Sequence, residues 1–473
     1  MTYINVVLEA RKVTTMLERR AYNILLDWKK DTLGKALLID GARQIGKTFL
    51  VEQFANNEYP SFIKIDFLED TQAASTLMHA TSAREAMEAL SLIAGRPVEP
   101  GRTLVFFDEV QAAQNLVTFS KYIVQDGRFP LVMSGSMLGV ELKGVRSFPV
   151  GFLREELMHP LDFLEFCRAL SVPESVIDAV EGAFHERTPV EPSVHERLMR
   201  IFRLYVVIGG MPKACEAYLN NGNDLGAARF EQESLVALYR EDIAKYAKDR
   251  ALQVKAIYDS IPAQIDKENK RYLFKQIKAD AKFERYANDF AWLVGARAAL
   301  KTTCVRDPKP MLKRSEEDNR FKLYLSDVGM LMSQYHADVA LAALSGERSV
   351  NFGGVYENAV AQELEAWGVP LHYYHNTRLG EVDFMGESGS CVLPIEVKSG
   401  KGYRRHVALN NLLRSQEYGI ETAYVLSESN IASETREGKT VYYLPLYMIP
   451  FVAQEMGKGS LDGLIVNPPS WDS

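Results

Sequence analysis

The stretch Lys35-Ala-Leu-Leu-Ile-Asp-Gly-Ala-Arg-Gln-Ile-Gly-Lys-Thr-Phe-Leu50 decides how the rest of the sequence is interpreted. An apolar run over 37–39 predicts a buried strand, Gly41 to Thr48 spells G-x-x-x-x-G-K-T, and apolar residues then recur at helical spacing. Strand, glycine loop and helix together are the context in which this motif binds phosphate. The glycines let backbone N–H groups point at one anion, and the helix adds the positive end of its dipole. The stretch therefore predicts a nucleotide-phosphate site.

Each residue of this glycine loop has an expected role. Lys47 would reach the β- and γ-phosphates, and the Thr48 hydroxyl would bind Mg²⁺. The alternative is a chance glycine turn before a helix, which the flanking pattern disfavours. The residues expected to bind the nucleotide are Gly41, Ala42, Arg43, Gln44, Ile45, Gly46, Lys47 and Thr48.

Two adjacent carboxylates follow a second apolar run, Thr103-Leu-Val-Phe-Phe-Asp-Glu-Val110. A buried parallel strand that ends in polar residues places them at the ligand crevice of a sheet. Asp108 comes about 60 residues after the glycine loop and is expected to hold the magnesium ion. Glu109 is expected to polarise the attacking water, so the expected catalytic residues are Lys47, Asp108 and Glu109. The alternative is a solvated strand end.

Ser134 and Ser136 end the next predicted strand, where a hydroxyl could sense the γ-phosphate or orient water. A plain serine-glycine turn is the alternative for this pair. Arg128, Arg146 and Arg154 are candidates for an arginine finger that acts across a subunit boundary, which would require a homo-oligomer. Each of them is also a typical surface salt-bridge residue.

Length, charge and cysteine content limit the class of protein. A chain of 473 residues is too long for one core and suggests three or four domains. The net charge of −7 argues against a surface coated by nucleic acid. The four cysteines lie far apart without a C-x-x-C motif, which favours reduced thiols over disulfides or a zinc site. Since no apolar run approaches the ~18 residues that span a bilayer, we expect a soluble, cytoplasmic protein without a membrane partner.

Four segments of the chain differ in pattern. Residues 1–159 read as an α/β nucleotide-binding core preceded by a helix, and residues 160–246 are helical throughout, as in a lid over the nucleotide. Residues 247–345 contain short helices, one of which is expected to end at Pro262, followed by a two-stranded hairpin. This order suggests a winged-helix module. Residues 346–473 form the fourth segment.

Two helical stretches inside the first segment carry more specific expectations. Residues 14–33 have an amphipathic helical pattern, and residues 71–93 read as one helix. Arg19 and Arg20 lie on the first of these and are expected to be solvated or helix-packing charges.

A basic stretch over 266–322 contrasts with the acidic chain. It holds 15 Lys plus Arg against 9 Asp plus Glu, a local charge of +6 in a chain of −7. Such a contrast is typical of contact with DNA or RNA. A solvated basic face, or a docking surface for an acidic neighbouring domain, is an equal alternative.

A second group of chemical residues lies in the last segment. Asp383 is on the first strand of a predicted hairpin, and Glu396 and Lys398 share one face of the second, while Glu357 lies on a preceding helix. Three carboxylates and a lysine suit a Mg²⁺ site for phosphodiester cleavage. The alternative is a fold that survives without cleavage. The cations that follow and could hold a phosphate backbone are Lys401, Arg404, Arg405 and His406.

Over nearly its full length the chain resembles a large family of bacterial and archaeal AAA-type ATPases that carry a C-terminal domain of unassigned function. The stretches that carry this resemblance are Gly41-Ala-Arg-Gln-Ile-Gly-Lys-Thr48, Phe107-Asp-Glu-Val-Gln111, Ser134-Gly-Ser136, Pro160-Leu-Asp-Phe-Leu-Glu-Phe166, Gly209-Gly-Met-Pro212, Tyr239-Arg-Glu-Asp-Ile-Ala-Lys-Tyr246, Phe321-Lys-Leu-Tyr-Leu-Ser-Asp327 and the hairpin over 380–398.

The resemblance implies an α/β fold, namely a P-loop NTPase sheet of the AAA type with a helical lid, a winged-helix linker and a C-terminal domain similar to the PD-(D/E)XK nuclease fold. It implies ATP and Mg²⁺ as cofactors, with Asp108 and Glu109 as the magnesium-binding and water-activating pair. In the nuclease-like domain it assigns Asp383, Glu396 and Lys398, and less directly Glu357. The family often has a basic residue after the glycine where this chain has Phe152, so the arginine finger stays unassigned.

Three functions follow from these observations. The first is an ATP-hydrolysing switch or motor with a C-terminal module that binds or cleaves nucleic acid. The second is a nucleic-acid-binding regulator in which ATP acts mainly as a ligand and the nuclease-like domain is inactive. The third is a metal-dependent nuclease that ATP gates.

Overall fold

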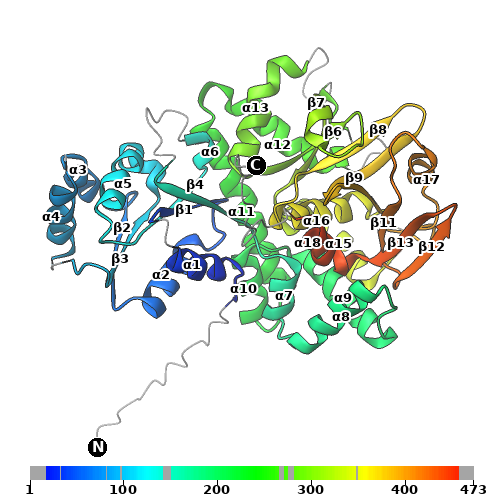
Figure 1. The fold of residues 1–473 in the computed structure, drawn as a ribbon, viewed down its shortest axis with the longest axis horizontal. Helices are drawn as coiled ribbons and strands as arrows, with labels where there is room; N and C mark the ends of the chain where they lie inside the picture. The colour runs from blue at the N-terminus through cyan, green and yellow to red at the C-terminus, as the bar shows by residue number, and fades with distance from the viewer. Residues whose placement is uncertain are drawn as a thin grey trace, which may run out of the picture.

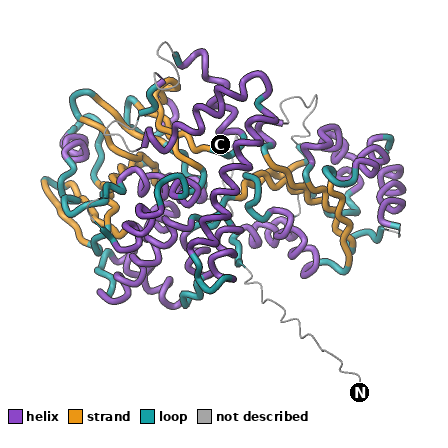
Figure 2. The backbone as a smooth tube through the Cα atoms, turned by 180° about the vertical axis from the view of Figure 1, so that it is seen from behind, coloured by secondary structure: helices purple, strands orange, loops and turns teal. Residues whose placement is uncertain are grey.

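The computed structural model of the protein describes residues 17–31, 34–80, 82–95, 98–141, 151–265, 271–274, 282–347 and 350–457. Two β-sheets lie on opposite sides of a layer of helices (Figure 1). Seen from behind, the strands again form two groups that helices separate (Figure 2). The N-terminal sheet is blue to cyan in Figure 1, and most of the C-terminal sheet is yellow to red.

The N-terminal sheet is parallel, with strand order β2-β3-β4-β1-β5. Its strands are β1 (Ala36–Gly41), β2 (Ser61–Asp66), β3 (Thr103–Asp108), β4 (Leu131–Ser136) and β5 (Leu153–Met158). Gly41, the last residue of β1, pairs with Ser136 of β4 and Met158 of β5. All residues of β3 and β4 are buried, as in a parallel sheet with both faces covered. The register therefore brings the ends of β1, β3 and β4 to one edge.

Helices surround this sheet, and two of the predicted helices differ in extent. The helices are α1 (Ala21–Lys30), α2 (Lys47–Glu58), α3 (Thr71–Met78), α4 (Ala83–Ala94), α5 (Gln114–Asp126) and α6 (Leu138–Glu141). The helix predicted over 14–33 is shorter, and positions 14–16 and 32–33 lie outside the described residues. The stretch 71–93 is two helices, because the Ser82 hydroxyl accepts from Glu85 N and starts α4 anew.

The central layer is helical, as the pattern over 160–246 predicts. It comprises α7 (Phe163–Ala169), α8 (Glu174–Glu186), α9 (Pro192–Ile208), α10 (Pro212–Asn220) and α11 (Leu225–Tyr246), followed by α12 (Ala251–Ile265) and α13 (Phe283–Gly295). The expectation that α12 ends at Pro262 is wrong, since the helix continues to Ile265. The fixed φ of proline suits a helix, and the one lost N–H donor falls in the last turn.

The C-terminal sheet has the strand order β12-β13-β11-β10-β9-β8-β6-β7. Its strands are β6 (Ala299–Val305), β7 (Glu316–Leu325), β8 (His372–Asn376), β9 (Gly380–Ser388), β10 (Cys391–Val397), β11 (Thr422–Ser427), β12 (Ala432–Arg436) and β13 (Lys439–Pro445). The predicted hairpin forms from β9 and β10, with Leu393 opposite Gly386. Strands β10, β11 and β13 run parallel to their neighbours in this set.

The hairpin predicted as the wing of a winged helix is part of this C-terminal sheet. Strands β6 and β7 are antiparallel, but β6 also pairs in parallel with β8, placing Cys304 beside Tyr373. An isolated two-stranded wing is therefore wrong for this chain, and strands from both sides of position 346 share one sheet. The sequence pattern predicted a two-stranded hairpin in this segment but not its pairing with β8. Pairing across the 69 positions from Cys304 to Tyr373 is set by burial against neighbours that no local pattern reveals.

The remaining helices pack against or near the C-terminal sheet. They are α14 (Val328–Met332), α15 (Ala337–Ser345), α16 (Gly353–Ala366), α17 (Val407–Arg414) and α18 (Ile449–Met456). Within the part of the chain that the structure describes, none of the helices has both the length and the apolar character needed to span a bilayer.

Buried side chains of α16 bond the backbone at the end of β7 and at the start of α14. Asn358 accepts from Leu325 N at 2.8 Å and donates to Leu325 O at 3.0 Å. Gln362 accepts from Val328 N at 2.8 Å. Buried backbone groups need partners, and these amides satisfy them where β7 turns into α14. The position of α16 on the sheet is thereby fixed by polar contacts as well as by packing.

Glu363 of α16 extends this contact to the central helices. Its Oε1 accepts from Phe163 N, at the start of α7, and from the Tyr205 hydroxyl of α9, each at 2.8 Å. Burial, and next the Asp162 carboxylate, raise the pKa of Glu363 well above its usual range. The neutral acid is thereby favoured, and it keeps an acceptor oxygen for both donors.

We expect Glu363→Gln to retain most of the stability, because its amide oxygen accepts as the neutral acid does. Glu363→Ala leaves the buried Phe163 N–H without its acceptor, whereas the Tyr205 hydroxyl keeps Leu161 O at 2.9 Å as an acceptor. The variant should lower the free energy of unfolding by about 1–3 kcal/mol. Urea denaturation of the three proteins at neutral pH measures the difference. An equal loss in both variants would contradict the assigned role of the acceptor oxygen.

Candidate functional site

The glycine loop joins β1 to α2 and needs both of its motif glycines. Gly46 has a φ of 88°, the left-handed region that favours glycine. A Cβ atom on Gly41 would collide with the carbonyl oxygen of Met158 on β5. Because α2 begins at Lys47, its first unpaired N–H groups belong to the end of the loop. These groups can bind a phosphate.

Lys47 is buried and bonded within the loop itself. Its Nζ donates to Gly41 O at 2.9 Å and to Ala42 O at 2.7 Å. Burial lowers the pKa of Lys47 to about 8, although the carboxylates of Glu109, Asp40 and Asp108 act in the opposite direction. A phosphate at the loop would replace the two carbonyl oxygens as the partner of this ammonium group.

Asp108 receives hydrogen bonds at the end of β3. The Thr48 hydroxyl donates to its Oδ2 at 2.8 Å, and the Ser134 hydroxyl donates to its Oδ1. Oxygen ligands of this kind are those that Mg²⁺ prefers, and Thr48 and Asp108 lie together as a magnesium ion at the phosphates requires. The donor set fits Mg²⁺.

Lys64 is a member of this site that the sequence interpretation missed. Its Nζ lies 3.4 Å from Asp108 Oδ2 and 2.9 Å from Glu52 Oε1. Opposite charges hold the pKa of the Lys64 ammonium above its ordinary value despite partial burial. A cation in the middle of an otherwise apolar, alternating strand was the available signal, since β2 pairs with β3.

Glu109 lies just beyond β3 in a strained conformation and is anchored by two side chains. Its φ of 54° is uncommon for a residue other than glycine and costs about 1–3 kcal/mol. Gln111 donates to Glu109 Oε2, and the Ser136 hydroxyl donates to the same oxygen at 3.1 Å. Gln111 also donates to Ser136 Oγ at 3.1 Å. The Glu109 carboxylate is therefore held against the end of β4.

Both predicted serines lie on β4 and contact the two carboxylates. Ser134 bonds Asp108, and Ser136 bonds Glu109. The side chain of Gln111, which sequence analysis quoted without a role, completes this contact. Strand register explains the arrangement, because β3 and β4 are parallel neighbours whose ends meet at one edge of the sheet.

Arg43, the third residue of the glycine loop, is held by α11. Its Nε lies 3.1 Å from Asp242 Oδ2, and its Nη2 donates to the Tyr246 hydroxyl at 3.1 Å. The Tyr239 hydroxyl donates to Arg43 O at 3.4 Å. One end of this central helix is thus bonded to the phosphate-binding loop.

Arg19 supports the glycine loop from the other side, contrary to the expectation of a solvated or helix-packing charge. Its guanidinium donates to Ile45 O at 2.9 Å and to His159 O, and lies 3.3 Å from Glu165. Its side chain is 8% exposed. Arg20, in contrast, stacks over the Trp367 ring at 3.7 Å. The contacts come from distant segments, so spacing along the chain gave no signal.

The candidate arginine fingers have partners within the chain or lie outside the described residues. Arg128 pairs with Asp126 at the surface. Arg154 pairs with Glu156 at 2.8 Å. Arg146 falls in 142–150, which the structure does not describe. No finger is assigned.

Part of the basic stretch over 266–322 is directed at acidic groups inside the protein. Arg297 lies 3.0 Å from Asp40, the residue before Gly41. Arg320 Nη1 lies 2.8 Å from Glu317. Residues 266–270 and 275–281 of this stretch are outside the described part. The count of 15 basic residues therefore overstates the charge available to a partner.

Two of the three carboxylates predicted as a second metal site, Glu357 and Asp383, lie around a lysine together with Glu381, which was not predicted. Lys322 of β7 is 0% exposed, and its Nζ lies 2.8 Å from Glu381, 3.6 Å from Asp383 and 3.8 Å from Glu357. Neighbouring acidic groups raise the pKa of Lys322 despite the opposing effect of burial. The position where a metal ion would neutralise these carboxylates is therefore taken by an ammonium group.

Glu396 and Lys398 form a separate pair at the end of β10. Lys398 Nζ donates to Glu396 Oε1 at 2.6 Å, while Asp383 Oδ2 accepts from Val397 N at 2.9 Å. Burial, and next Asp383, raise the pKa of Glu396 to about 7. Among the described residues, no group of three or more His, Cys, Asp or Glu side chains is placed to hold a metal ion. The arrangement does not fit the Mg²⁺ site predicted from Glu357, Asp383 and Glu396.

Comparison with known families identifies three regions. Residues 33–167 match the model of the AAA domain. Residues 199–340 match a domain of unknown function (DUF8612), and residues 352–447 match another (DUF4143). No curated protein matches the chain.

Two solved structures are similar at low identity. One is the Aeropyrum pernix ORC1 protein in complex with DNA, at 13% identity and a TM-score of 0.29, covering 72% of this chain and 95% of that one. The other is C. elegans PCH-2, at 9% identity and a TM-score of 0.22, covering 38% and 51%. The AAA match and the parallel sheet together confirm an AAA-type P-loop ATPase domain, the class of domain that binds ATP.

The low pKa of Lys47 predicts that nucleotide affinity falls as the pH rises above about 8. Phosphate binding requires the ammonium form, which the free protein loses in this range, whereas the nucleotide phosphates are already ionised. The loss should approach about tenfold per pH unit. Titration with a fluorescent ATP analogue between about pH 7 and pH 10 measures it.

Lys47→Arg is the matched control, because a guanidinium stays charged throughout this range. It should bind more weakly than the natural chain but without the fall above about pH 8. The same slope in both proteins would show that another group is titrating.

Proposed function

We propose that this chain is an ATP-hydrolysing switch or motor in which Lys47, Thr48 and Asp108 hold the nucleotide and its Mg²⁺ ion. The observation that carries the proposal is the pair of hydrogen-bonded carboxylates at one sheet edge. Asp108 is bonded to Thr48 and Ser134, and Glu109 next to it is bonded to Ser136. One carboxylate suits the metal, and the other suits the attacking water.

In this proposal each residue of the site has a separate role in ATP hydrolysis. Lys47 leaves the loop carbonyls and binds the phosphate oxygens, where its charge stabilises the transferring group. A Mg²⁺ ion held by Thr48 and Asp108 would neutralise phosphate charge. Glu109 accepts the proton of the attacking water, and Gln111 and Ser136 orient its carboxylate. The loop residues 41–48 supply backbone N–H groups.

Glu109→Gln should reduce ATP hydrolysis at least about 100-fold while nucleotide binding persists, because an amide cannot accept the proton. Phosphate release and a separate binding titration measure the two properties. Equal rates in the natural protein and the variant would remove the assigned role of Glu109.

Gln111→Ala provides the matched test of orientation. It leaves Glu109 ionisable but removes one of its two anchors, so kcat should fall by about tenfold with little change in KM. A loss confined to KM would instead place Gln111 in nucleotide binding.

The second function that an observation favours is a nucleic-acid-binding regulator whose nuclease-like C-terminal domain does not cleave. The observation is the buried Lys322 ammonium among Glu357, Glu381 and Asp383. A metal-dependent nuclease needs a cation-binding position open to a divalent ion. With Lys322 in that position, the similarity to the PD-(D/E)XK fold would concern architecture and not cleavage. The helical lid over 160–246, with its borders at 159/160 and 246/247, and the homo-oligomer remain part of the proposal, whereas the border at 345/346 does not, since β6 and β7 share the C-terminal sheet.

We expect no cleavage of DNA or RNA by the purified protein with Mg²⁺ or Mn²⁺. Lys322→Met should cost about 3–5 kcal/mol of stability, because it leaves buried carboxylates without their cation. Mn²⁺ should then raise the melting temperature of this variant but not that of the natural chain. Metal-dependent cleavage that Lys398→Ala abolishes would refute the non-cleaving reading.

A further inference from the structure

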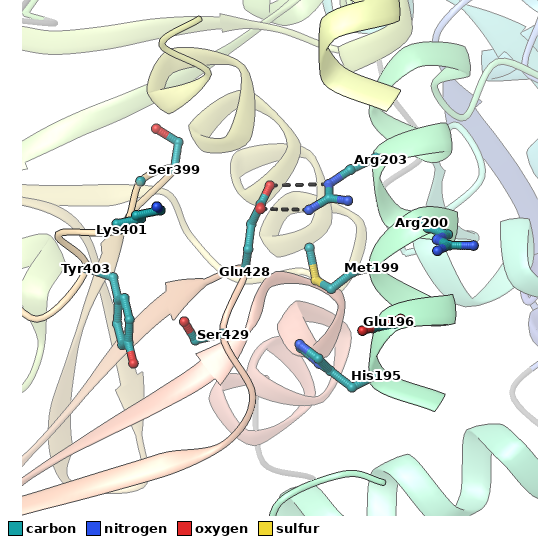
Figure 3. A pocket seen from close by; sticks show the side chains of 11 residues that line it. His195, Glu196, Met199, Arg200, Arg203, Ser399, Lys401, Tyr403, Glu428 and Ser429 are labelled. Atoms are coloured by element: carbon teal, nitrogen blue, oxygen red, sulfur yellow. Dashed lines mark hydrogen bonds and ion pairs between the residues drawn. The ribbon is translucent and has the colours of Figure 1, made fainter. Parts of the chain in front are cut away.

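A pocket of about 530 Å³ lies between α9 and the loops that follow β10 and β11 (Figure 3). These two strands are parallel neighbours, and ligands bind preferentially beyond the carboxyl ends of parallel strands. The volume is within the range of small-molecule sites. Its lining includes His195, Arg203, Lys401, Tyr403, Glu428 and Ser429.

The loop on one side of the pocket reads Ser399-Gly-Lys-Gly-Tyr403. A Cβ atom on Gly400 or Gly402 would meet nothing within 4 Å, and neither glycine has a left-handed φ. The fold therefore does not require glycine at these two positions. Glycine does leave backbone N–H groups open to a closely approaching anion, as in other phosphate-binding loops.

The charges around the pocket leave a lysine available. Glu428 is compensated, because Arg203 lies 2.7 Å from its Oε2 and the Tyr356 hydroxyl donates to its Oε1 at 2.7 Å. Lys401 is exposed and makes no hydrogen bond or ion pair with the described residues. In Figure 3, Arg203 extends from α9 toward Glu428, and Lys401 lies on the loop across the cavity.

Two further charged residues of α9 lie on the lining. Arg200 and Glu196 are both exposed, so water screens each of them. The pocket therefore combines one compensated ion pair, two cations and one screened carboxylate. Tyr403 adds an aromatic ring beside the lysine, a surface on which a base can stack.

We propose that this pocket binds a phosphate group carried either by a nucleotide or by a nucleic-acid strand. Lys401 supplies a point charge for the phosphate, and the amides of the 399–403 loop supply further donors. The inference goes beyond ATP hydrolysis, because none of the lining residues belongs to the glycine loop or to the ends of β3 and β4. It requires no metal ion.

The chain offers a matched control three residues along, at Arg404. The cations predicted to hold one phosphate backbone do not all line the same pocket. Lys401 lines the pocket described above, whereas Arg404 and His406 line another pocket of about 270 Å³ beside β12 and β13. Arg404, like Lys401, is exposed and on the same segment. Lys401→Ala therefore removes a charge from the proposed site. Arg404→Ala removes an equal charge next to the site, and with it a long hydrogen bond of 3.4 Å to the Tyr403 hydroxyl.

The experiment uses the full-length chain with Lys47→Ala, which silences the first phosphate site. Fluorescent ADP forms one arm, and a fluorescent single-stranded oligonucleotide forms the other. In the arm that binds, Lys401→Ala should weaken affinity by about tenfold or more. Arg404→Ala should change it by less than about threefold. For the oligonucleotide, Lys401→Ala should also lower the salt dependence by about one ion.

Binding in either arm that depends on Lys401 and not on Arg404 supports the pocket and identifies the source of the phosphate. Absence of binding in both arms, or equal losses in the two alanine variants, would overturn it. Unchanged melting temperatures for both variants show that the fold is intact. The experiment does not measure ATP hydrolysis, so a negative binding result leaves the proposed ATPase activity untouched. If the protein proves not to hydrolyse ATP, the binding result can still be interpreted.

Discussion

The structure depends on buried polar contacts that join its two sheets through the helices between them. Side chains of α16 bond the backbone after β7 and the start of α7. From α7, Glu165 pairs with Arg19, whose guanidinium donates to Ile45 O in the glycine loop. Each contact satisfies a group that would otherwise be buried without a partner, so the loss of any one of them would lower the free energy of unfolding. The phosphate site and the C-terminal sheet are therefore parts of one hydrogen-bonded framework.

Local patterns were sufficient to propose the parts of the candidate ATP site that adjoin one another along the chain. The glycine loop and the Asp108-Glu109 pair were recognisable because strand, loop and helix follow in order, and apolar runs mark the buried strands. Lys64 and Arg19 were missed or misjudged, since their partners lie on other elements. Strand pairing had the same effect on fold prediction, because the hairpin in 247–345 was expected to stand alone as a wing and its pairing with β8 was missed.

For the carboxylates of the C-terminal sheet, the sequence identified residues that do lie close together, but the chemistry proposed for them differs from the predicted metal site. Asp383, Glu396 and Lys398 lie near one another as the hairpin pattern predicts. The decisive residue is Lys322, which sits on a strand about 60 residues earlier in the chain and was counted with a basic surface. A pattern of acids identifies where positive charge must be supplied. It does not identify whether a metal ion or a lysine supplies it, because that depends on which strand lies beside them.

Helix α11 acquires a mechanical meaning from its two ends. Near its C-terminus it holds Arg43 of the glycine loop, and near its N-terminus Arg229 donates to Ser333 O and Tyr335 O, just after α14. Its 22 residues span about 33 Å as a single rod. Because one continuous helix connects the two sets of contacts, a displacement of Arg43 in the proposed ATPase would be passed along it to the backbone carbonyls after α14. The glycine loop and the segment after α14 are thus mechanically connected without any intervening loop.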